Sequence, residues 1–191
     1  SPTLYLNPAL HAPSAFPVPT AVQHHKGREM NIPYVEVYTD GSCLKNPGPG
    51  GWASIILRKT PGSTAVRTKT LCGGEADTTN NRMELLAVIR ALEWLPKGKY
   101  PVVLYTDSQY VCKAITENWL HSWVAKSWRT SSGSPVKNVD LWQRFQAVLE
   151  SRAFPSFKAH WVKGHAACEY NNKCDILARE QAQSVANTTR S

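Results

Sequence analysis

Hydrophobic and polar residues alternate over residues 34–40, in the sequence YVEVYTD, and this period of two is typical of a β-strand. The segments WASIILR at 52–58 and VRTKTLCG at 66–73 also read as strands. The sequence NPGPGG at 46–51 supplies turn-forming residues between the first two. Because the connections are short, we predict an antiparallel meander of three strands.

Helical periodicity begins near residue 80 and continues to residue 95. Thr79, Asn80 or Asn81 can cap the start of this helix. Five apolar side chains fall on one stripe of it: Leu85, Val88, Ile89, Leu92 and Leu95.

Strands and helices alternate in the second half of the chain. The expected elements are a strand at 101–108, a short helix at 108–116, a tryptophan-rich basic stretch at 119–137, a helix at 138–151, a strand at 157–162 and a helix at 171–184. The order β-β-β-α-β-α-α-β-α predicts an α/β fold. We expect a mixed five-stranded sheet, with three antiparallel strands plus two parallel ones, flanked by helices on both faces.

Residues 1–33 differ from the rest of the chain. They contain six of the thirteen prolines and no acidic residue before Glu29. Proline at this density prevents helix formation and breaks strand pairing, so we expect a proline-rich tail or linker. The compact domain is expected at 34–184, followed by a C-terminal tail at 185–191.

Composition narrows the class of partner. A net charge of +8 favours a polyanion, most often nucleic acid. Five scattered cysteines without a C-x-x-C pair argue against a zinc site and suit free thiols in a reducing compartment, so we expect a cytoplasmic protein. No apolar run approaches the roughly 18 residues that span a bilayer, so we expect no membrane partner. We also expect a monomer.

Two predicted strands end in the same way, YTDGS at 38–42 and YTDSQ at 105–109. If they are neighbours, Asp40 and Asp107 lie side by side at the carboxyl edge of the sheet, where open α/β sheets bind ligands. Two such charges repel each other strongly unless a cation neutralises them. Taken alone, Asp40 with the following glycine is also a common turn.

Glu84 and Asp175 are two further acids, which we place in the first turns of their helices. Each alone could simply complement the helix dipole. Together with the two strand-end aspartates they form an oxygen-only set, which suits hard cations such as Mg²⁺ or Mn²⁺. Two such ions about 4 Å apart can hold the attacking and leaving oxygens of a phosphoryl displacement.

Six blocks of sequence between about Tyr34 and Ala182, in order and at compatible spacing, resemble type 1 ribonuclease H, the bacterial-style ribonuclease HI. The blocks are YTDGSCLKNPGPGGW, TTNNRMELLAVIRALE, YTDSQYV, WRTSSGSPVKNVDLWQ, WVKGHA and NNKCDILAR. The resemblance implies a ribonuclease H-like fold. It also implies an endoribonuclease that cuts the RNA strand of RNA–DNA hybrids with two Mg²⁺ ions, for which Mn²⁺ can substitute, and leaves 5′-phosphate and 3′-hydroxyl ends.

The same resemblance assigns roles at the active site. Asp40, Glu84, Asp107 and Asp175 are implied to bind the metal ions, with Asp40 bridging both. His165, in the loop before the last helix, is implied to assist proton transfer or product release, for which its near-neutral pKa is suited.

The resemblance also implies the contacts with the hybrid. Four amide side chains match minor-groove contacts to bases or 2′-hydroxyls, although turn and cap roles also suit them: Asn46, Asn80, Asn81 and Gln109. The stretch from Trp119 to Arg144 matches a basic protrusion that grips the DNA strand. The contacts expected on that strand are Trp123, Lys126, Trp128, Arg129, Thr130, Lys137 and, outside the protrusion, Thr79. Trp142 and Trp119 are expected in the core.

Two other functions remain open from the sequence, and a third is disfavoured. The chain could be the ribonuclease H domain of a reverse transcriptase, with residues 1–33 as its connection to a polymerase. It could be a non-catalytic module that binds hybrids. A nuclease of the wider superfamily acting on DNA alone is disfavoured by the amide side chains suited to 2′-hydroxyls.

Overall fold

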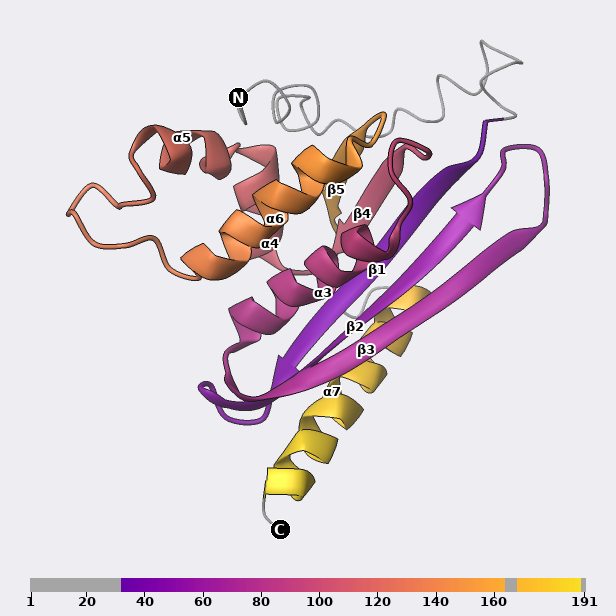
Figure 1. The fold of residues 1–191 in the computed structure, drawn as a ribbon. Helices are drawn as coiled ribbons and strands as arrows, with labels where there is room; N and C mark the ends of the chain where they lie inside the picture. The colour runs from indigo at the N-terminus through magenta and orange to yellow at the C-terminus, as the bar shows by residue number, and fades with distance from the viewer. Residues whose placement is uncertain (1–31, 164–167, 190–191) are drawn as a thin grey trace.

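The computed structural model describes residues 32–163 and 168–189, which form five strands and five helices (Figure 1). The strands are β1 (Tyr34–Cys43), β2 (Gly48–Lys59), β3 (Val66–Thr78), β4 (Val102–Thr106) and β5 (Phe157–Trp161). The helices are α3 (Asn80–Trp94), α4 (Gln109–Thr116), α5 (Trp119–Ala125), α6 (Val139–Arg152) and α7 (Glu169–Thr189).

The strands form one sheet in the order β3-β2-β1-β4-β5. The first three pair antiparallel, whereas β4 pairs in parallel with both β1 and β5. The predicted mixed sheet is therefore confirmed, and so is the placement of the two strands that end in Thr-Asp next to each other.

Side-chain alternation along the strands builds a core on each face of the sheet, and helices cover both faces (Figure 1). Val35 and Val37 of β1 belong to the larger core, which the sheet shares with α3, α4 and α6. Tyr38 of β1 and Ala53 of β2 belong to the smaller core, with Ala178 of α7. The predicted stripe of α3 is buried in the larger core at every position: Leu85, Val88, Ile89, Leu92 and Leu95.

The hairpin between β1 and β2 is tighter than predicted. Strand β1 runs on to Cys43 and β2 starts at Gly48, so most of the expected loop at 46–51 is strand. The glycines there lack side chains that would block neighbouring elements: a Cβ at Gly51 would overlap the backbone of Ala178 and Ala182 in α7. Glycine here therefore serves close packing between strand and helix as well as turning the chain.

Helical structure extends further than the sequence indicated. Helix α5 lies within the tryptophan-rich stretch, and the predicted order of elements did not include it as a separate helix. Helix α7 begins at Glu169 and runs to Thr189, so the predicted limits of the last helix, 171–184, were wrong at both ends. Of the proline-rich segment, residues 1–31 lie outside the described part of the chain. Within the described residues, no helix combines the length and apolarity that crossing a bilayer requires.

Candidate active site

Asp40 and Asp107 each follow the last residue pair of the ladder between β1 and β4, which joins Thr39 to Thr106. Asp40 is itself still in strand, opposite Ala53 of β2, so the turn interpretation of Asp40 was wrong. Asp107 is the first residue after β4, and its backbone oxygen accepts a hydrogen bond of 3.1 Å from the indole of Trp161.

Glu84 reaches the same edge of the sheet because α3 approaches β1 closely at Gly41. A Cβ on Gly41 would lie 2.5 Å from the backbone nitrogen of Glu84, so no residue larger than glycine fits without a shift. Thr79 caps the helix, accepting a hydrogen bond of 3.2 Å from the backbone N–H of Arg82. Since α3 starts at Asn80, Glu84 lies in its second turn, and the first-turn interpretation was wrong.

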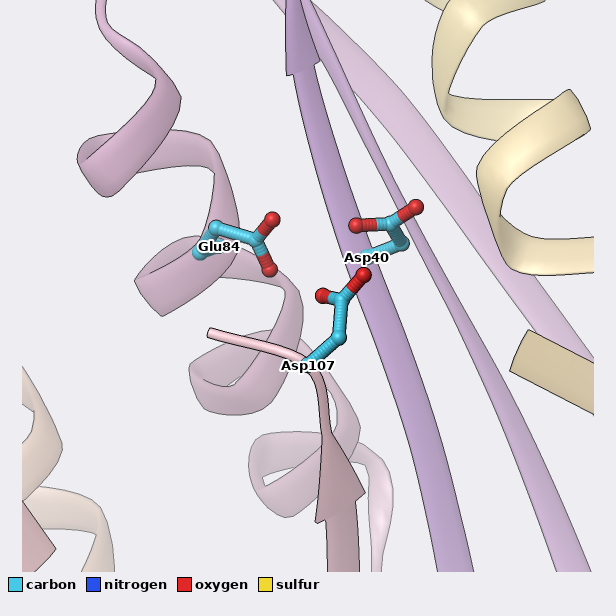
Figure 2. Close-up of side chains that lie close together, drawn as sticks. All are labelled: Asp40, Glu84 and Asp107. Atoms are coloured by element: carbon cyan, nitrogen blue, oxygen red, sulfur yellow. The ribbon is translucent and has the colours of Figure 1, made fainter. Parts of the chain in front are cut away.

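The three carboxylates converge from a strand, a helix and a strand end (Figure 2). One oxygen from each of Asp40, Glu84 and Asp107 lies within 4.8 Å of those of the other two. Burial raises the pKa of Asp40 to about 7, and repulsion from Asp107 adds to the rise. Burial also raises the pKa of Glu84 well above its usual range, followed by repulsion from Asp40. The cluster therefore resists carrying its full negative charge when no cation is bound.

The donor set fits a hard divalent cation. All three side chains offer oxygen ligands, which Mg²⁺ and Mn²⁺ prefer. The Oε2 atom of Glu84 is shielded from solvent and has no hydrogen-bond partner among the described residues. A buried carboxylate oxygen without a partner is costly, and a bound cation would remove that cost.

Asp175 approaches the same region from α7. Its repulsion is among the causes of the raised pKa of Asp40. Asp175 is not part of the close group of three, and its Oδ2 instead forms an ion pair of 2.9 Å with Arg179. Because α7 begins at Glu169, Asp175 lies in the second turn rather than the first, contrary to the prediction.

A cleft of about 370 Å³ contains all four acids, and we refer to it as the acidic cleft. Three of the predicted amide side chains also line it: Asn80, Asn81 and Gln109. The other side chains of its lining were not singled out from the sequence: Ser108, Tyr110, Asn171 and Asn172. The sequence could have indicated Asn171 and Asn172, because they precede Asp175 by four and three residues and so share its face of the helix.

Asn46 lies at the rim rather than in the lining of this cleft. Its Oδ1 accepts a hydrogen bond of 3.2 Å from the backbone N–H of Asn80, the first residue of α3. The side chain thus fixes the β1–β2 loop to the start of the helix. This is the capping role considered for Asn46, while its predicted contact with the hybrid stays a prediction.

The basic protrusion consists of α5 and the loop that follows it, and none of its residues lines the acidic cleft. Trp123 and Trp128 pack partly buried against the core, with Trp142 fully buried behind them. Lys126 and Lys137 are exposed. The protrusion therefore exposes lysine side chains to solvent, while its tryptophans pack against the core.

Internal bonds hold the rest of the loop after α5. Arg129 donates to the carbonyl of Gly133 at 2.8 Å, and the hydroxyls of Thr130 and Ser132 lie 2.9 Å apart. Arg144, at the end of the stretch, forms a double hydrogen bond with Glu93 of α3 at 2.6 and 2.7 Å. It ties α6 to α3 and is thereby separated from the lysines of the protrusion. His165 lies outside the described residues.

The metal-free protein should lose stability as pH rises. The pKa of Asp40 is raised to about 7 in the folded state. The stability that its protonation contributes is therefore fully present below about pH 4 and is lost as the pH rises to 7. We expect the free energy of unfolding in EDTA to fall by about 1.4 kcal/mol per pH unit for one such group between about pH 4 and pH 7, and the unfolding temperature to fall with it. Asp40→Asn should flatten this fall. Parallel melting curves for the two proteins across this range would contradict the expectation.

Known relatives match this chain over most of its length. The family profile described as RNase H matches residues 33–183. A protein named Ribonuclease H from Hahella chejuensis (strain KCTC 2396) is 53% identical over 144 residues, which cover 75% of this chain and 90% of the relative. Another protein of that name, from Nitratidesulfovibrio vulgaris (strain DSM 19637 / Miyazaki F), is 50% identical over 155 residues, which cover 81% of this chain and 93% of the relative. The crystal structure of LC9-RNase H1, a type 1 RNase H with the type 2 active-site motif, is 32% identical with a TM-score of 0.68, over 80% of this chain and 74% of that one.

Proposed function

The chain belongs to the ribonuclease H family and is an endoribonuclease that acts on RNA–DNA hybrids, and we propose that it cuts the RNA strand with two divalent metal ions held in the acidic cleft. The observation that carries the mechanism is the convergence of three carboxylates within 4.8 Å, one with a buried oxygen that has no hydrogen-bond partner in the described part of the chain. Mg²⁺ is the proposed ion in the cell, and Mn²⁺ a substitute.

Each acid has its own part in this proposal. Asp40 belongs to the close group with Glu84 and Asp107 and also interacts electrostatically with Asp175, which suits it to serve both ions. When bound, the ions supply activation of the attacking water and stabilisation of the leaving 3′ oxygen, so that the products carry 5′-phosphate and 3′-hydroxyl ends. The protein holds its carboxylates ready on a strand, a helix and a strand end, which limits the reorganisation needed on binding.

His165 belongs to the proposal as a proton carrier. It stands ten residues before Asp175 in the sequence. An imidazole titrates near neutral pH and can pass a proton to the leaving oxygen or help product release. Losing an auxiliary proton carrier slows turnover without removing the metal site.

We further propose that the hybrid lies across the acidic cleft with its minor groove over the amide side chains. Asn80, Asn81 and Gln109 line the cleft beside the acids, and each amide can donate to and accept from a 2′-hydroxyl. The DNA strand would then extend to Thr79 and the protrusion. Its proposed contacts there are the six predicted residues: Trp123, Lys126, Trp128, Arg129, Thr130 and Lys137.

The alternative functions are not favoured. The relatives at 50% and 53% identity are named Ribonuclease H, and this chain covers 93% and 90% of them. That coverage favours a ribonuclease H over the corresponding domain of a reverse transcriptase. A non-catalytic hybrid-binding module would have no need of a buried carboxylate cluster that destabilises the metal-free fold.

Location and oligomeric state complete the proposal. All five cysteines are free in the structure, which supports a reducing compartment and so the cytoplasm. We propose a monomer, because one chain supplies all four acids and the amide lining of the cleft.

Cleavage of labelled substrates tests the function directly. An RNA–DNA hybrid labelled on the RNA strand should be cut with Mg²⁺ and left intact with EDTA. Double-stranded RNA and double-stranded DNA of the same sequence should stay intact under both conditions. Tight binding to an uncut hybrid would leave a binding module, and cutting of double-stranded DNA would contradict the assigned substrate.

Single replacements of the protrusion lysines should weaken substrate binding with little effect on chemistry. Lys126→Ala and Lys137→Ala should each raise KM, leave kcat near the wild-type value, and lower the slope of log affinity against log salt by about 1. Lys97→Ala is the matched control, since Lys97 is exposed in the loop after α3. Salt slopes equal to that of wild type would show that these lysines do not contact phosphate.

A further inference from the structure

Asp175 is paired with a cation of its own helix. Its Oδ2 lies 2.9 Å from a guanidinium nitrogen of Arg179, one turn further along α7. The Asp175 side chain lines the acidic cleft, whereas Arg179 is outside the lining. Among the described residues, the close carboxylate group contains Asp40, Glu84 and Asp107 without Asp175.

We propose that Arg179 competes with a divalent cation for Asp175 and thereby sets the metal concentration at which the acidic cleft fills. The inference rests on the proposed function only in that a divalent cation binds this cleft. Arg179 acts through Asp175 and is thus a positioning residue rather than a catalytic one.

Two features make the competition effective. A cation beside Asp175 offsets part of the negative charge that attracts a metal ion, and it also repels that ion directly. The pair is weak enough to exchange, because it is an i,i+4 pair on the surface and the Arg179 side chain is 60% exposed. A metal ion in the cleft can therefore displace Arg179 without unfolding α7.

The cleft offers Asp175 a new hydrogen-bond donor when Arg179 leaves. Asn171 lines the cleft one turn before Asp175. Both polar atoms of its amide are shielded from solvent and lack a partner among the described residues. Side chains four residues apart on a helix can meet, so the Asn171 amide can donate to the released carboxylate. The exchange would satisfy a buried amide that is otherwise unpaired.

A pair of charge-removing variants on α7 tests the proposal. Arg179→Gln removes the competing cation and keeps a residue that favours helix. Lys173→Gln is the matched control, because it removes the same charge from the same helix two residues from Asp175. Lys173 is exposed and lies over the ring of Tyr170, 5.6 Å from its centre.

Mg²⁺ binding is measured by calorimetry without substrate, and the Mg²⁺ concentration for half-maximal hybrid cleavage is measured in parallel. For Arg179→Gln we expect Mg²⁺ to bind roughly threefold to tenfold more tightly and the half-maximal concentration to fall with it. Lys173→Gln should change either value by less than about twofold.

Three results would overturn the inference, and they are distinguishable. Wild-type affinity in Arg179→Gln would show that Arg179 does not compete. Equal tightening in both variants would assign the effect to the net charge of α7. Absence of Mg²⁺ binding in wild type would overturn the proposed metal site itself, and this inference with it.

Discussion

Replacement of Glu84 by glutamine should abolish hybrid cleavage while raising the stability of the metal-free protein. The substitution keeps the size of the side chain and removes one negative charge from a cluster whose members repel one another. Loss of a metal-binding carboxylate should lower kcat by about 10³-fold or more, because metal ions and fixed charges stabilise the transition state by several kcal/mol. The same change relieves the cost of burying a carboxylate oxygen for which residues 32–163 and 168–189 supply no hydrogen-bond partner.

The opposite signs of these two effects make the Glu84→Gln result specific. Hybrid cleavage is measured with saturating Mg²⁺. Thermal unfolding is measured in EDTA at pH 8, where the carboxyl groups of the wild-type cluster are driven to lose their protons and repel one another. Glu180→Gln, an exposed acid on α7, is the control and should change neither quantity appreciably. A Glu84→Gln protein that cuts normally would remove Glu84 from the metal site. An inactive variant that melts earlier than wild type would indicate structural damage instead.

The strand pattern and the paired Thr-Asp endings were enough to predict the sheet and the meeting of Asp40 with Asp107. That inference succeeded because parallel neighbours bring their carboxyl ends to one edge, whatever the loops do. The distant acids Glu84 and Asp175 were singled out from their predicted places on helices, where a helix-dipole role also suited each of them. Their assignment to the metal site came from the resemblance to family motifs. The structure moves both into second turns, where the dipole explanation is weaker.

Other features depend on contacts that a linear pattern does not encode. The ion pair of Arg144 with Glu93 could not be assigned from charge alone, because the two residues are 51 positions apart and lie on different helices. The glycines of β2 read as turn residues, since only the packing of α7 reveals why Gly51 must lack a side chain. The sequence therefore predicted which residues could bind a metal ion, but it did not predict where two elements approach each other closely.

Gly41→Ala should reduce activity strongly without altering any polar or charged group. Gly41 directly follows Asp40, and its Cα faces the turn of α3 that carries Glu84. A methyl group there would lie 2.5 Å from the backbone nitrogen of Glu84 and 2.7 Å from the carbonyl carbon of Met83. Both are backbone atoms of a helix and cannot rotate away, so α3 must move as a unit. We expect a stability loss of about 1–3 kcal/mol, which is typical of an overpacked site.

The displacement of α3 would open the distance between Asp40 and Glu84, and a misplacement of about 1 Å in a catalytic group can cost about 100-fold in rate. We therefore expect kcat for hybrid cleavage to fall by about that factor at a temperature where Gly41→Ala is still folded, with weaker Mg²⁺ binding by calorimetry. Gly62→Ala is the control: it has no neighbour within 4 Å, but its φ of +84° strains an alanine. That variant should lose about 1 kcal/mol of stability and keep wild-type kcat. Equal loss of activity in both variants would trace the effect to general destabilisation, whereas loss confined to Gly41→Ala would show that the close approach of helix and strand sets the geometry of the carboxylates.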